Sequence, residues 1–182
     1  YAPAGQHRSA PMLHLHAEPV VTTPGQPRYR GASKPTNNAA ELLAIAAGAD
    51  AVRRHAKPGE HAEIHSDSRL AILAALGVSR KKSRNQNKKK SSSKHKLDEA
   101  LVVAARLAFQ RAQKATGHKV VIRKVKGHSG DNWNEIADAL AAVGRTLAAD
   151  QQPRTAELID RLQRAIDGIG GDEPPDIACH GF

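Results

Sequence analysis

The sequence has a single cysteine, Cys179, and no Cys and His residues at the paired spacing of a structural zinc site. An internal disulfide is therefore excluded. We expect an intracellular, reducing compartment, with the choice between cytoplasm, nucleus and organelle left open. There is no run of about 18 apolar residues and no secretory signal pattern at the N-terminus, so we expect no membrane association.

Aromatic residues are also scarce, at 3% of the 182 residues, whereas 40% of the residues are hydrophobic. This is enough apolar material for one domain of ordinary size with an extra segment. Because few large rings are present, the core must be built mainly from Ala, Val, Leu and Ile, which suits helices packed on a sheet.

Positive charge is concentrated in one segment. The formal net charge is +10, and residues 80–96 contain nine Lys or Arg and no acid, so the rest of the chain is almost neutral. The low complexity of this segment predicts a mobile loop or a frayed helix end. Such a local excess of charge favours a polyanionic partner, of which nucleic acid is the commonest.

Hydrophobic spacing predicts helices over residues 39–54, 68–76, 97–115 and 132–143, with Asn38 as N-cap of the first and Gly144 ending the last. Strands are expected over residues 62–66 and 118–125. Residues 12–16 and 27–30, separated by a turn-rich stretch, predict an irregular β-hairpin. The alternation of strands and helices predicts an α/β fold.

We expect the domain to span residues 1–145 and residues 146–182 to form a C-terminal extension. An amphipathic helix is predicted over residues 155–166 of this extension. Its apolar face is expected to cover the sheet, to pair with a protein partner or to self-associate. That face consists of Leu158, Ile159, Leu162 and Ile166.

Three carboxylates lie at positions where a catalytic sheet collects ligands: Glu41 in the first turn of a helix, Asp67 after a strand, and Asp138 on the last domain helix. Converging carboxylates with no thiolate indicate Mg²⁺ or Mn²⁺, and hence phosphoryl transfer. Each also has a structural alternative. Glu41 suits a capping box with Asn38, Asp67 suits a helix cap, and Asp138 suits a solvated helix position.

The sequence motifs around these carboxylates resemble those of ribonuclease H type 1 over roughly residues 12–145. Residues 36–42, Thr-Asn-Asn-Ala-Ala-Glu-Leu, are similar to the opening of that family's first helix, and residues 64–68, Ile-His-Ser-Asp-Ser, to its fourth strand. Residues 126–130, Lys-Gly-His-Ser-Gly, resemble its His loop, and residues 134–138, Asn-Glu-Ile-Ala-Asp, its last catalytic helix. The resemblance implies a ribonuclease H-like mixed sheet with helices on both faces.

The resemblance also implies an activity, which is hydrolysis of the RNA strand of RNA:DNA hybrids by a site with two divalent metal ions. Glu41, Asp67 and Asp138 would be metal ligands. His128 would move protons, because imidazole titrates near neutrality, although it also suits a loop position that only caps a neighbour. The hybrid itself would be contacted by Asn37, Asn38 and Asn134.

Family members often carry a basic protrusion that grips the hybrid backbone, and residues 80–96 match it in place and charge. A solvated loop or a nuclear-localisation patch is the alternative. The family's protrusion usually includes Trp, whereas this segment has no aromatic residue and so no stacking contribution. The cations expected to bind the hybrid are Lys81, Lys82, Lys88, Lys89 and Lys90.

The family's first strand, with its catalytic Asp, has no match in this sequence. The first Asp is Asp50, and Glu18 is the only earlier acid. Three explanations stay open: a fragment whose upstream segment supplies the Asp, an Asp from another chain, or a degenerate domain that binds without cutting. We expect an endoribonuclease if the Asp is supplied, and otherwise an inactive nucleic-acid-binding module in a larger assembly. A retroelement-derived domain fits the first hypothesis, whereas the His loop argues against an integrase.

Overall fold

A computed structural model of the chain describes residues 13–78, 97–127 and 132–148. In the C-terminal part it describes residues 157, 160, 162–164, 166–167 and 177–179. The chain divides into two compact units. We call Val20–Gly127 the core unit, and Tyr1–Pro19 together with His128–Phe182 the α4 unit.

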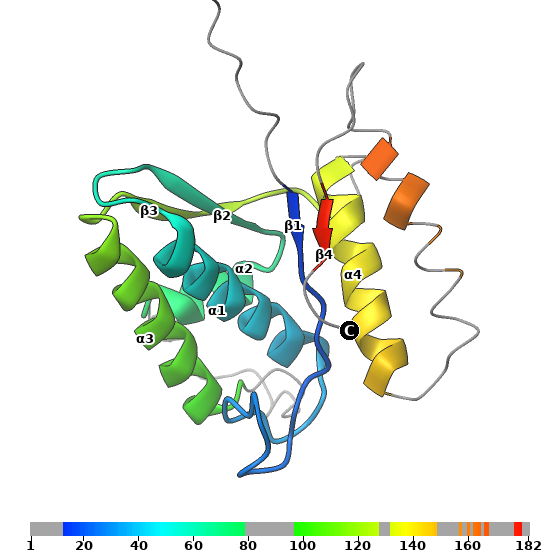
Figure 1. The fold of residues 1–182 in the computed structure, drawn as a ribbon. Helices are drawn as coiled ribbons and strands as arrows, with labels where there is room; N and C mark the ends of the chain where they lie inside the picture. Colours follow the sequence, from blue (N-terminus) through cyan, green and yellow to red (C-terminus); the bar gives the residue numbers. More distant parts are fainter. Residues whose placement is uncertain are drawn as a thin grey trace, which may run out of the picture. The chain divides into compact units, whose positions relative to one another are not determined.

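The core unit contains a parallel strand pair and three helices (Figure 1). Strands β2 (Ala62–Ser66) and β3 (Val120–Lys124) pair in register, from Ala62 opposite Val120 to Ser66 opposite Lys124. Helix α1 (Asn37–His55) lies beside α3 (Glu99–Ala115), and the short α2 (Arg69–Ala75) follows β2. Parallel strands joined through helices are the arrangement of an α/β fold.

The core of this unit is rich in alanine. Leu42, Ile45 and Leu101 are at most 1% exposed, and several alanines of α1 and α3 are fully buried between them. Small side chains let the two helix backbones approach closely, so a core with few aromatic rings still packs. The predicted composition is confirmed for the described residues, with Phe109 added as a buried ring.

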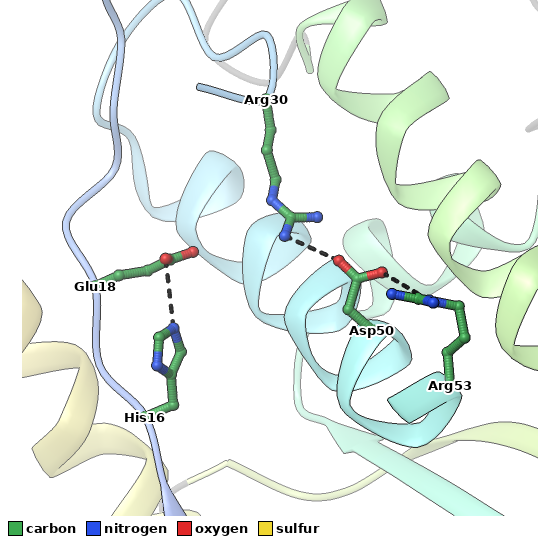
Figure 2. Close-up of polar contacts among 5 residues, drawn as sticks. All are labelled: His16, Glu18, Arg30, Asp50 and Arg53. Atoms are coloured by element: carbon green, nitrogen blue, oxygen red, sulfur yellow. Dashed lines mark hydrogen bonds and ion pairs between the residues drawn. The ribbon is translucent and has the colours of Figure 1, made fainter. Parts of the chain in front are cut away.

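The loop before α1 is tied to both long helices. Arg30 Nη2 lies 2.9 Å from Asp50 Oδ2 on α1, and Arg53 lies 3.9 Å from the other carboxylate oxygen (Figure 2). Ser33 donates to Asp98 through its backbone N–H at 2.9 Å and its hydroxyl at 2.7 Å. The Asp98 side chain therefore accepts hydrogen bonds from the loop and makes no capping hydrogen bond to α3.

The α4 unit contains helix α4 (Asn132–Ala148) and a second parallel strand pair, β1 (Leu13–Leu15) with β4 (Ile177–Cys179). After β1, His16 Nε2 lies 3.4 Å from Glu18 Oε2 (Figure 2). A Cβ atom on Gly144 would lie 2.8 Å from the Glu18 carbonyl oxygen, so α4 packs closely on this segment.

Two predictions about these regions are wrong. Residues 27–30 form no strand, and β1 pairs with β4 near the other end of the chain instead of forming a hairpin. Helix α4 continues through Gly144 to Ala148. In the C-terminal extension, Leu162 and Ile166 are buried against Ile136 and Ala139 of α4, and a protein partner or self-association through the rest of the apolar face stays a prediction. Leu158 and Ile159 lie outside the described residues.

The predicted α/β class is confirmed, with helices and small parallel strand pairs in the described part of the chain. The predicted boundary at residue 145 stays a prediction. Within the described residues, no helix combines the length and the hydrophobicity that crossing a bilayer requires.

Candidate functional site

Asp67 lies directly after β2, at the carboxyl end of the strand, and is half-buried. The N-cap of α2 is Ser68, whose hydroxyl accepts a hydrogen bond from the Ala71 N–H at 3.3 Å. Because Ser68 caps the helix, the alternative that Asp67 serves only as a cap does not fit. The Asp67 carboxylate stands where α/β sheets collect their ligands.

The turn after β3 approaches this carboxylate closely. The Val125 N–H donates to the Ser66 carbonyl oxygen at 3.0 Å, which keeps the chain beside the end of β2. Two residues later, a Cβ atom on Gly127 would lie 2.5 Å from Asp67 Oδ2 and 3.4 Å from its Cγ. Only glycine fits without moving the carboxylate, so Gly127 sets how near the turn comes to Asp67.

Sequence reasoning did not single out Gly127. The signal was a glycine at the first turn after a strand, next to a candidate catalytic His, where close approach of backbone to a site is common. The partner of that close approach is a residue 60 positions earlier in the chain. Local sequence patterns do not specify such a partner.

Glu41 is a half-buried residue of α1. The N-cap of this helix is Thr36, whose hydroxyl accepts from the Ala39 N–H at 3.2 Å, and the first turn holds no acid. The predictions of Asn38 as N-cap and of Glu41 in the first turn are therefore wrong by two residues. The capping-box position belongs to Ala39, so that alternative for Glu41 does not fit.

Asn37 and Asn38 are the first two residues of α1, the former exposed and the latter half-buried. Asn134 and Asp138 lie one turn apart on α4 and are both half-buried. Residues four apart share one side of a helix, so these two side chains face the same way. His128 and the five predicted lysines of residues 81–90 lie outside the described residues.

Comparison with protein families decides the identity of the domain. The family model of RNase H matches residues 17–146, which is most of the chain. The chain belongs to the RNase H family. Its domain is therefore of a kind that acts on nucleic acid, in a family of nucleases that generally use divalent metals. No curated protein and no solved structure matches the chain.

The carboxylates suit the family's metals by their chemistry, since Mg²⁺ and Mn²⁺ prefer hard oxygen ligands. Glu41 and Asp67 belong to the core unit and Asp138 to the α4 unit. In the described part of the chain, no three His, Cys, Asp or Glu residues are grouped closely enough to hold a metal ion. The donor types fit the RNase H metals, and a shared site for the three carboxylates stays a prediction.

A second acid on β2 has quite different surroundings. Glu63 lies on the exposed face of the strand, with His65 Nε2 at 2.9 Å and Arg123 Nε at 2.7 Å from its carboxylate. The hydrogen bonds to His65 and to Arg123 lower the pKa of Glu63. This acid is engaged by two neighbouring side chains on the strand pair, so it provides a control for Asp67.

Proposed function

We propose that this RNase H domain hydrolyses the RNA strand of RNA:DNA hybrids with two Mg²⁺ or Mn²⁺ ions held by Glu41, Asp67 and Asp138. The observation that carries the proposal is the position of Asp67, at the carboxyl end of β2 with Gly127 against its carboxylate. Metal ions held there would supply activation of a water and stabilisation of the leaving oxygen. The protein contributes the carboxylates and their orientation.

The remaining predicted residues serve substrate binding and proton transfer. In this proposal, Asn37 and Asn38 at the start of α1 and Asn134 on α4 contact the hybrid, where the 2′-hydroxyl distinguishes RNA from DNA. His128 moves a proton during water activation or product release. Binding of hybrid phosphates is assigned to Lys81, Lys82, Lys88, Lys89 and Lys90.

Cleavage of a labelled RNA:DNA hybrid with Mg²⁺ tests the proposal directly. The assay compares this chain with a version extended upstream by a strand that carries the family's Asp, each with and without Asp67→Asn. We expect cleavage by the extended version and its loss in the Asp67→Asn variant. Uncut hybrid with both versions, together with salt-dependent binding, would overturn the enzymatic proposal.

The second candidate is a domain that binds hybrids without cutting them. It is favoured by the absence of any Asp before Asp50 in this sequence, so that a first-strand Asp must come from elsewhere. The same assay separates the two functions, because binding and cleavage are measured independently. An intracellular, reducing compartment stays a prediction for either function.

A further inference from the structure

Exposed basic side chains gather where β2 and β3 begin. Helix α1 leads through a turn into β2, and α3 leads through a turn into β3 (Figure 1). The two turns are joined, because the Gly59 N–H donates to the Thr116 carbonyl oxygen at 3.2 Å and the Ala62 N–H donates to that of Lys119 at 3.1 Å. We call the exposed residues Arg53, Arg54, Lys57, Lys114 and Lys119 the basic end.

Few carboxylates balance these cations. Glu60 Oε2 accepts a hydrogen bond from the Lys57 N–H at 2.8 Å, and Arg53 lies 3.9 Å from Asp50. Asp50 is already bound by Arg30 at 2.9 Å. The basic end therefore carries an excess of positive charge, even though the chain outside residues 80–96 is almost neutral in total.

Helix electrostatics explain only part of this cluster. Cations in the last turn of a helix stabilise its partly negative C-terminus, and this accounts for Arg53, Arg54 and Lys114. Lys57 and Lys119 lie beyond the helix ends, where the effect falls away. Lys119 also follows His118, a non-glycine residue held at φ 65°, an uncommon conformation that often marks functional turns.

We propose that the basic end binds the sugar-phosphate backbone of nucleic acid, as a contact surface separate from the Asp67 end of β2. Lys and Arg attract phosphates without reading sequence, and residues 53–61 and 114–119 include no Phe, Tyr or Trp for base stacking or membrane insertion. The five residues of β2 separate the two ends by about 17 Å. Binding here needs no cleavage, so the inference goes beyond the proposed function.

The test measures the affinity of the full chain for a fluorescein-labelled RNA:DNA hybrid by anisotropy, in EDTA and over a series of salt concentrations. Lys57→Gln/Lys119→Gln removes two cations that helix electrostatics do not explain. Lys34→Gln/Arg145→Gln removes the same charge from exposed residues elsewhere, including one in the last turn of a helix. Melting temperatures establish that both double variants are folded.

We expect the first double variant to weaken binding several-fold at low salt and to reduce the slope of log K against log salt by about 1 to 2, while the control changes little. An unchanged slope in the first variant, or an equal loss in the control, overturns the proposal. Because EDTA prevents metal-dependent cleavage, a failure of the enzymatic proposal leaves this result unaffected.

Backbone amide NMR on the unmodified chain locates the contact independently. Titration with a short hybrid should shift the amides of residues 57, 59–61 and 116–120, and the absence of shifts there overturns the proposal. Vesicles containing phosphatidylserine provide the other polyanion. If the first double variant loses vesicle binding and keeps hybrid binding, the surface belongs to a membrane and the nucleic-acid proposal is lost.

Discussion

The two units of this RNase H chain differ in the hydrophobic residues that their described parts bury. The core unit buries a large set of aliphatic residues between α1, α3 and one face of β2. The described core of the α4 unit includes Ile136, Ala139 and Val143 of α4, together with Leu162 and Ile166 of the C-terminal extension, which follow the family match. Of the proposed metal ligands, Glu41 and Asp67 belong to the core unit and Asp138 belongs to the α4 unit.

Core truncations should show this difference most strongly. Leu42→Ala in the core unit should lower the free energy of unfolding by about 3 to 4 kcal/mol, because Leu42 is fully buried among many neighbours. Ile166→Ala should cost about 2 kcal/mol, because its cluster is smaller. Urea denaturation gives both values, and hydrogen exchange reports each unit separately. Equal losses of unfolding free energy in the two variants would contradict the difference between the units.

Both units should nevertheless be needed for chemistry. Asp67→Asn in the core unit and Asp138→Asn on α4 should each lower kcat/KM on a hybrid at least about a hundredfold. Removing a residue that orients a metal ligand typically lowers activity roughly 10- to 100-fold, and removing the ligand itself should lower it further. Steady-state cleavage by the extended chain measures this. Glu63→Gln, on the same strand as Asp67, is the control and should keep activity. Full activity in Asp138→Asn would assign the site to the core unit alone.

Two glycine substitutions sharpen the same contrast. Gly127→Ala should displace the Asp67 carboxylate and weaken Mn²⁺ binding about tenfold, with little change in stability, because the added atom meets a side chain. Gly144→Ala meets the backbone of Glu18 and should loosen the α4 unit. Calorimetric metal titration and melting temperature distinguish them. Unaltered metal binding in Gly127→Ala would contradict a positioning role.

The smallest expected effect concerns the loop before α1. Asp98 accepts two hydrogen bonds from Ser33, and both lower the pKa of its carboxyl group. The bond from the backbone N–H has the larger effect, and the bond from the hydroxyl has the smaller one. A lowered folded pKa adds stability above the ordinary Asp value of about 3.9, and this stability is lost as the pH falls through the folded value. Ser33→Ala should therefore cost about 0.5 to 1 kcal/mol at neutral pH and almost nothing in strong acid. A cost independent of pH in urea melts would argue against this pair.

The elements with strong local patterns were predictable. Helices α1, α2 and α3 and strands β2 and β3 lie within a few residues of their predicted ranges, because each buries one periodic face. The start of α1 was placed at Asn38 because Thr36, Asn37 and Asn38 are all good caps, and hydrophobic spacing does not choose among them. Only the hydrogen bond from the Ala39 N–H to Thr36 settles the position.

Other features that the sequence did not predict concern partners that lie far away along the chain. Residues 13–15 were recognised as extended, yet nothing near them indicates pairing with residues 177–179. The amphipathic pattern around Leu162 predicts that this face is buried, but it does not predict which element covers the face. In the structure, that element is α4. The approach of Gly127 to Asp67 likewise depends on the register of β2 and β3.

The β1–β4 pair has a consequence for how the chain folds during synthesis. Leu13 pairs with Ile177, so the chain must be synthesised past residue 177 before this contact forms. The core unit closes within residues 20–127 and can fold while translation continues. Pairings of such long range form slowly, because the intervening chain must first be ordered. We therefore expect residues 13–15 to reach their final structure later than the core unit.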